Sequence, residues 1–332
     1  MVVICIKCLE ILVPPAIVSR GLFLGRHLKK KVEFFSADWL TVVGELYLPM
    51  DVEENGTFPA IVLCQGLSGI KEKVLPEIAE TFREAGYVVL AFDYRGAGES
   101  DDTREKPYLF PLERAEDVFY AISYIKSLPY VDEHKIGLYG IGYGASVAIY
   151  VAALDKRIRC VVAVSSPGNG DAFMASLRKQ RAWVSFQKEI EDDRLRRLKT
   201  GKSRPVPLEK AVPFSPSFRE KYNRLDNKNK GESIPETGAS PDKPMLSLES
   251  AEAMIKFRPD CFVHLVAPAP LLFIHGEADD AAHIEFAREM YQKAGKPKKF
   301  VAFPNMDHID LYTGKGLKQQ VKISLKWFKR YL

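Results

Sequence analysis

The chain has 332 residues, of which 46% are hydrophobic and 27% carry a charge. These shares match an ordinary globular protein and exclude the collagen-like, coiled-coil and intrinsically disordered classes. The 48 basic and 43 acidic residues leave a net charge of only +5, which is too small an excess to predict a nucleic-acid partner. We expect one large domain, or a core with an inserted cap.

The five cysteines are scattered and odd in number, which is unlike the disulfide framework of a small secreted domain and favours a reducing, cytoplasmic location. Cys5 and Cys8 form a C-x-x-C without a second pair, so they predict no metal site. Residues 1–30 are expected to form an N-terminal arm. Its apolar stretch is interrupted at Lys7 and broken at Pro14, so it predicts no membrane span.

Strand-like and helix-like segments then alternate along most of the chain. Buried or alternating apolar runs predict strands at 32–35, 42–48, 60–64, 88–92, 136–139, 160–164, 271–274 and 300–303. Apolar residues at helical spacing predict helices at 71–85, 112–128, 145–153, 284–294 and 317–331. Repeated strand–helix–strand units predict a mostly parallel sheet with helices on both faces. Ligands of such sheets bind beyond the carboxyl ends of the strands.

The stretch 167–263 departs from this rhythm, since it is charged and contains several prolines. We expect it to form a helical cap, inserted between core segments 31–166 and 264–332, because a structureless loop of that length is rare. Residues 176–230 contain 16 basic and 7 acidic residues. They form either a surface for an anionic carrier or substrate, or a solvated helical face. The cap aromatics Phe173, Trp183 and Phe186 are candidates for an apolar substrate pocket.

The strongest motif is Gly140-Ile141-Gly142-Tyr143-Gly144, which lies between a predicted strand and a predicted helix. It has the frame of the nucleophile elbow G-x-S-x-G, in which a tight turn presents a nucleophile. The flanking glycines are present, but the central position is glycine. Without an oxygen or sulfur, residue 142 cannot form an acyl-enzyme.

Three nearby residues are candidates to replace the missing nucleophile. Ser146 lies one helical turn after residue 142, where packing is the simpler role. Cys64 and Ser68 lie nearer the expected pocket, but free cysteines are usually buried and inert. None of the three restores a nucleophile convincingly.

Asp279 follows the predicted strand 271–274, and His308 follows the predicted strand 300–303. The chain order of nucleophile position, acid and base is that of the α/β-hydrolases. His308 would act as general base, with Asp279 orienting it. The backbone N–H groups of Leu67, after the strand 60–64, and of Tyr143 are placed to form an oxyanion hole.

Together these motifs resemble the α/β-hydrolase superfamily, and more narrowly its dienelactone-hydrolase and polyketide-transferase members, from about residue 31 to 332. The resemblance implies an α/β-hydrolase fold: a mostly parallel eight-stranded sheet with helices on both faces and an inserted helical cap. It also implies a Ser- or Cys-His-Asp site for ester, thioester or carbon–carbon cleavage, or for acyl transfer. In that site Asp279 and His308 match the acid and base, Leu67 and Tyr143 the oxyanion positions, and Gly142 the nucleophile.

Three functions remain open from the sequence. The chain is an inactivated hydrolase variant, or a lyase or cyclase that uses His308 and Asp279 without a covalent intermediate, or a binding pseudoenzyme. The expected partner is a small-molecule acyl substrate, free or linked to coenzyme A or a carrier protein, and a homodimer is a further option. No loop has a dinucleotide pattern and no cluster has metal-ligand spacing, so neither a cofactor nor a metal is expected.

Overall fold

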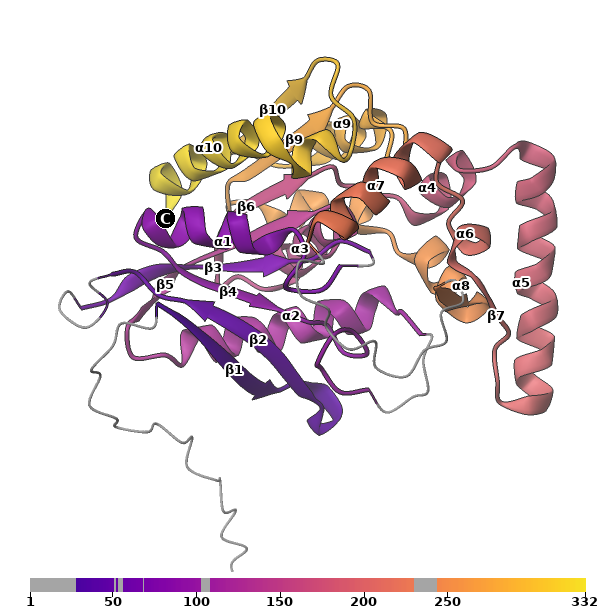
Figure 1. Cartoon of the computed structure of the whole chain (residues 1–332), viewed down its shortest axis with the longest axis horizontal. Helices are drawn as coiled ribbons and strands as arrows, with labels where there is room; N and C mark the ends of the chain where they lie inside the picture. The colour runs from indigo at the N-terminus through magenta and orange to yellow at the C-terminus, as the bar shows by residue number, and fades with distance from the viewer. Residues whose placement is uncertain (1–27, 51, 53–55, 68, 103–107, 230–243) are drawn as a thin grey trace, which may run out of the picture.

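The computed structural model describes residues 28–50, 52, 56–67, 69–102, 108–229 and 244–332 (Figure 1). The Cys5–Cys8 pair, Ser68 and nearly all of the predicted N-terminal arm lie outside them. One eight-stranded sheet has the order β1-β2-β4-β3-β5-β6-β9-β10, parallel except for the β1–β2 and β2–β4 pairs. The predicted mostly parallel eight-stranded sheet is therefore confirmed. Its strands are β1 (Lys29–Phe35), β2 (Thr41–Tyr47), β3 (Phe58–Cys64), β4 (Val88–Phe92), β5 (Val131–Ile141), β6 (Ile158–Val164), β9 (Leu271–Gly276) and β10 (Lys298–Phe303).

Successive side chains of the central strands point to opposite faces of the sheet, so the core has two layers. Val62 and Leu90 point to one face of the sheet, and their neighbours Ile61 and Val89 point to the other. Because both faces carry apolar side chains, helices must cover both. The first face is covered by α2 (Pro111–Lys126), α3 (Tyr143–Leu154) and α9 (Ile284–Lys293), and the second by α1 (Leu75–Glu84) and α10 (Gly314–Tyr331) (Figure 1).

Two predicted boundaries were wrong by four or five residues. Helix α1 begins at Leu75 rather than at residue 71, because the amide of Lys71 donates to Asp93 and the chain enters the helix only just before Pro76. Strand β5 begins at Val131 rather than at residue 136, and its first residues include an exposed charged stretch. An apolar run marks only the buried part of a strand, so the exposed part was not predicted.

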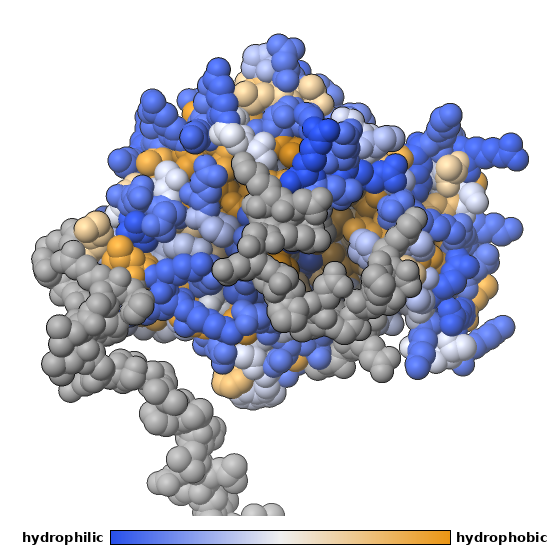
Figure 2. Space-filling view, viewed as in Figure 1, coloured by the Kyte–Doolittle hydropathy of each residue, from blue (hydrophilic) through white to orange (hydrophobic). Residues whose placement is uncertain are grey.

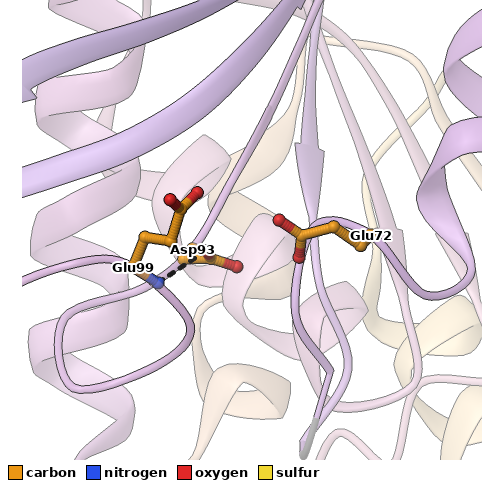
Figure 3. A group of neighbouring side chains, drawn as sticks. All are labelled: Glu72, Asp93 and Glu99. Carbon is orange, nitrogen blue, oxygen red and sulfur yellow. Dashed lines mark hydrogen bonds between the residues drawn. The ribbon is translucent and has the colours of Figure 1, made fainter. Parts of the chain in front are cut away.

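Three carboxylates, those of Glu72, Asp93 and Glu99, have oxygens within 4.8 Å of one another (Figure 3). The ammonium group of Lys71 lies 2.6, 2.7 and 2.8 Å from them, with only 1% of its side chain exposed. Burial lowers the pKa of Lys71, but hydrogen bonds to Asp93, Glu72 and Glu99 outweigh it and raise the pKa. The cluster thus contains its own buried cation and joins the loops after β3 and β4.

The segment between β6 and β9 forms the region predicted as a cap, and the name cap is kept for residues 167–263. It contains α4 (Gly170–Ser176), α5 (Gln180–Thr200), β7 (Pro205–Pro207), α6 (Leu208–Ala211), α7 (Pro216–Asn229), β8 (Met245–Ser247), α8 (Leu248–Lys256) and the 3-10 turn η2 (Pro259–Cys261). Three further 3-10 turns are η1 (Ala37–Trp39), η3 (Val263–Val266) and η4 (Asp310–Tyr312). In Figure 1, α5 is the helix farthest to the right, away from the sheet. The exact domain boundaries stay a prediction.

Several basic residues of the cap are paired within it. Arg194 and Arg197 on α5 contact Glu252 on α8, and Arg204 and Lys210 contact Glu189 at 2.8 and 2.6 Å. Part of the basic excess is therefore neutralised inside the cap. Among the described residues, no helix is both long enough and apolar enough to cross a membrane.

We expect Glu252→Gln to lower the free energy of unfolding at pH 7 by about 1–3 kcal/mol, because the buried carboxylate accepts hydrogen bonds from Arg194, Arg197 and Lys256. Burial raises the pKa of Glu252, but these cations outweigh it and lower the pKa to about 2. Since this value lies below the ~4.3 of an unfolded glutamate, the stabilisation is complete above about pH 4.3 and lost as pH falls towards 2.

Urea denaturation at several pH values would measure this difference. The difference in the free energy of unfolding between the parent and Glu252→Gln should decrease from pH 5 to pH 3. The exposed Glu191→Gln on α5 should differ from the parent by almost nothing at either pH. If the loss of unfolding free energy in Glu252→Gln were independent of pH, the carboxylate charge would not be what stabilises the cap.

Candidate active site

The site lies where the strand order reverses. Strands β3 and β5 are hydrogen-bonded neighbours, with Cys64 paired to Gly140, while β4 lies on the far side of β3. The loops after β3 and β5 therefore emerge side by side at the carboxyl edge of the sheet. Such a switch point is the usual ligand site of an open α/β sheet.

Gly142 forms the sharp turn between β5 and α3. Its φ of 52° and ψ of −123° are strained for a residue with a side chain, and its N–H donates to the Val164 carbonyl at 2.8 Å. A Cβ on Gly144 would clash with the carbonyl oxygens of Gln65 and Cys64. The elbow thus approaches the loop after β3 so closely that only glycine fits at position 144.

The structure brings Asp279 and His308 together across the ends of β9 and β10. Nδ1 of His308 lies 2.7 Å from Oδ2 of Asp279, while Oδ1 of Asp279 accepts from the N–H groups of Ala281 and Ala282. Burial raises the pKa of Asp279, but the imidazoles of His308 and His275 outweigh it and hold the pKa well below its usual range. The carboxylate is therefore ionised, Nδ1–H of His308 is the donor, and Nε2 faces residue 142.

A second imidazole supports the carboxylate from behind. His275, fully buried at the end of β9, has Nε2 2.7 Å from the Ala282 carbonyl and 3.3 Å from Oδ2 of Asp279. A carbonyl only accepts, so Nε2 of His275 carries the proton in that bond. Asp279 is thus held by two backbone amides and flanked by two imidazoles, which restricts its rotation.

Tyr312 occupies the position facing the base. Its Oη lies 3.0 Å from Nε2 of His308. A Cβ on Gly142 would lie 3.2 Å from that Oη and 3.3 Å from the same Nε2. The Tyr312 hydroxyl therefore makes the hydrogen bond that a nucleophile at position 142 would otherwise make.

Arg114 determines how the loop after β3 is oriented. This buried guanidinium donates to the carbonyls of Gly66 at 3.1 Å and Leu67 at 2.8 Å. In a trans peptide the C=O and the following N–H point in opposite directions, so the Leu67 N–H points away from Arg114. Leu67 lines the cavity above Gly142. Tyr143 is the first residue of α3, where an N–H has no acceptor within the helix.

A cavity of about 350 Å³ opens above Gly142, between the core loops and the cap. Figure 2 shows hydrophobic side chains in a hollow near the centre of this face, with hydrophilic residues around it. The volume and the mostly apolar lining suit a small organic molecule. The cap contributes Phe173, Leu208, Glu209, Val212, Phe214, Phe218, Arg219, Tyr222, Asn223, Leu225 and Pro244, and the core side includes Gln65, Gly66, Leu67, Val74, Ile141, Gly142, Tyr143, Ala281, Ala282, His308, Ile309 and Tyr312.

The three predicted pocket aromatics have different positions. Phe173 on α4 lines the cavity, whereas Trp183 and Phe186 on α5 do not. Both α5 rings instead pack against the guanidinium of Arg178, whose centre lies 5.8 and 3.9 Å from them. Burial lowers the pKa of Arg178 to about 10. We assign Trp183 and Phe186 to packing within the cap, because both rings contact the Arg178 guanidinium and neither lines the cavity.

Two of the candidate replacement nucleophiles, Ser146 and Cys64, have surroundings that suit packing rather than catalysis. The Ser146 hydroxyl is 2.9 Å from that of Ser166 and accepts from the Gly168 N–H. Cys64 is fully buried, and burial raises the pKa of its thiol to about 12. A thiol with such a pKa has almost no thiolate at neutral pH, so it is a poor nucleophile.

Several residues of the site were missed in the sequence. Tyr312 lies four residues after His308, a spacing that places two side chains together only if a helical turn follows, as η4 does. Phe214, Phe218 and Tyr222 have the same four-residue spacing, and the ring of Phe218 lies 5.6 Å from the imidazole of His308. The four-residue spacing of these aromatic residues is the sequence pattern that could have predicted α7.

Comparisons with known proteins agree on the fold. The family model described as alpha/beta hydrolase fold matches residues 59–315. The chain is 27% identical to a thiohydrolase (aneE) of Aspergillus aculeatus over 91% of this chain and 93% of the relative. It is 27% identical to a polyketide transferase (ATR5) of Stachybotrys chlorohalonatus over 92% and 98%. The crystal structure of the alpha/beta hydrolase GrgF from Penicillium sp. sh18 superposes with a TM-score of 0.74 at 22% identity, covering 91% and 98%.

We expect Gly144→Ala to destabilise the protein by about 1–3 kcal/mol or more, because the new methyl group meets backbone oxygens that cannot rotate away. Gly66→Ala on the facing loop is the matched control, since its Cβ would meet only one atom, at 3.7 Å. Chemical denaturation of both variants measures the difference. Equal stability of the two would contradict the close approach of elbow and loop.

Proposed function

Because the chain belongs to the α/β-hydrolase fold family, we propose that it acts on an acyl or polyketide-like small molecule without a covalent intermediate at residue 142. The observation that carries this proposal is the Asp279–His308 pair, hydrogen-bonded at 2.7 Å and directed at a glycine. A general base remains while the nucleophile is missing. Such a site suits proton transfer rather than acyl-enzyme formation.

The proposed reaction begins with removal of a proton from a carbon next to a carbonyl group. The C–H bond breaks, Nε2 of His308 gains a proton, and the electron pair stays on the substrate as an enolate. Asp279 stabilises the resulting imidazolium. The N–H groups of Leu67 and Tyr143 would form the oxyanion hole for the enolate oxygen, with Arg114 holding the first of them in place.

The enolate then has three outcomes that need no acyl-enzyme: it expels a leaving group, attacks another carbonyl, or closes a ring. These correspond to lyase, aldol-type and cyclase chemistry. The relatives named thiohydrolase and polyketide transferase support a thioester or polyketide-like substrate. The apolar cavity, roofed by Phe173, Phe214 and Phe218 of the cap, supports the same substrate class.

A second candidate is an inactivated hydrolase variant, and the backbone of Gly142 favours it. The φ of 52° is the strained conformation in which the elbow presents a nucleophile, and it is retained here without one. A purely binding role is the third alternative. The linkage of the acyl group to coenzyme A or a carrier protein, a homodimer and a dienelactone-type substrate all stay predictions.

We expect His308→Ala to lose at least 10²-fold in the exchange of the acidic protons of acetoacetyl-N-acetylcysteamine, because the variant lacks the general base. Deuterium incorporation followed by NMR measures the rate above the uncatalysed background. His134→Ala, which removes an exposed imidazole remote from the cavity, should exchange like the parent. Equal rates for His308→Ala and the parent chain would favour a binding role.

We expect Gly142→Ser to gain covalent labelling by a fluorophosphonate at residue 142, together with hydrolysis of activated aryl esters or thioesters. The new Cβ lies within reach of His308, although the positive φ should cost about 1–3 kcal/mol in stability. Mass spectrometry locates the label. A folded variant that neither labels nor hydrolyses would contradict the elbow or the oxyanion geometry.

A further inference from the structure

Tyr312 is the hydroxyl group closest to the reacting position in the described part of the site. Its Oη is 3.0 Å from Nε2 of His308 and 3.2 Å from the place of a Cβ on Gly142, and Tyr312 lines the cavity. Hydrogen bonds within the turn hold it in place. Asp307 Oδ1 accepts from the N–H groups of Ile309 and Asp310, and the Tyr312 N–H donates to the Ile309 carbonyl at 2.9 Å.

The direction of the hydrogen bond follows from the groups around it. Asp279 is ionised and only accepts, so Nδ1 of His308 carries a proton, and in the uncharged imidazole Nε2 then has a lone pair. Burial and the negative charge of Asp279 raise the pKa of Tyr312 well above its ordinary value, outweighing the opposite effects of Ser165 and Gly142. The phenol is therefore protonated at neutral pH and donates its O–H to Nε2.

We propose that Tyr312 takes the place of the missing nucleophile's hydroxyl as a proton relay, and is a catalytic residue of this chain. This inference rests on the proposed function. When substrate binds, its acidic C–H bond breaks and the proton passes to Tyr312 Oη. The original phenolic proton passes to Nε2 of His308 in the same step. The substrate keeps the electron pair as an enolate, Tyr312 remains neutral, and the imidazolium is paired with Asp279.

The relay explains why a tyrosine and a glycine occur together at this site. A Cβ at position 142 would lie 3.2 Å from the Tyr312 oxygen and 3.3 Å from Nε2 of His308, so a serine hydroxyl there would be crowded against Tyr312 and would face the same Nε2. A phenol whose ionised form is disfavoured by burial is a poor nucleophile but can still pass a proton in a concerted transfer. A site that has the Tyr312 hydroxyl in place of a hydroxyl at position 142 can therefore transfer protons but cannot transfer acyl groups.

Tyr312→Phe tests the relay, because it removes only the hydroxyl. Deuterium exchange of acetoacetyl-N-acetylcysteamine should fall at least 10²-fold in kcat, while the Kd of the probe changes less than about threefold. Tyr139→Phe is the matched control: it removes a buried hydroxyl that bonds Gln320 outside the cavity, and its exchange rate should equal that of the parent.

The outcomes separate the relay from the proposed function. If His308→Ala loses deuterium exchange while Tyr312→Phe retains it, the relay is wrong and the proposed function still holds. No exchange by the parent chain overturns both. A fall in exchange with an unchanged Kd and an unchanged melting temperature supports the relay.

The position of Tyr312 can be tested without turnover. In Gly142→Ser the new hydroxyl and Tyr312 compete for Nε2 of His308, so Gly142→Ser/Tyr312→Phe should react with a fluorophosphonate at least tenfold faster than Gly142→Ser alone. Equal labelling rates overturn the assignment of Tyr312 to the nucleophile's place, whatever the exchange experiment gives. Faster labelling of the double variant supports it.

Discussion

The hydrogen bond between His308 and Asp279 is the interaction on which the chemistry of this site depends. It joins the loops after β9 and β10, fixes the tautomer of the imidazole and directs Nε2 towards Gly142. Backbone amides and His275 hold the carboxylate from the other side. A buried carboxylate needs such partners to stay ionised, so the surrounding loops are constrained by the same charge.

A second constraint is the close approach of the elbow to the loop after β3. Gly144 leaves no space between helix α3 and the carbonyls of Gln65 and Cys64, and Arg114 holds the loop from its opposite side. These contacts keep the loop after β3 beside the start of α3, where we propose the oxyanion hole, even though residue 142 has no side chain. Under the proposed function, the site retains the groups that act on charge and on protons, and lacks the group that would form a bond to substrate.

The cap completes the site by enclosing it. Phe214 and Phe218 line the cavity, and Lys221 on α7 contacts Asp307 and Asp310 in the loop that carries His308. The position of α7 is therefore coupled to the turn that presents both His308 and Tyr312. Among the cap elements, α7 contributes Phe218, Arg219, Tyr222, Asn223 and Leu225 to the cavity lining, and α4 contributes Phe173.

Apolar periodicity and glycine spacing are local properties, so they predict the sheet, the helices on its two faces, the elbow and the chain order of Asp279 and His308. The contacts of residues that meet through folding are visible only in the packed molecule. Folding places Tyr312 against His308, Arg114 beneath Leu67, and Trp183 and Phe186 on Arg178 outside the cavity. The physical reason is that a side chain's partner depends on how separate segments pack, and packing follows from shape and charge over the whole molecule.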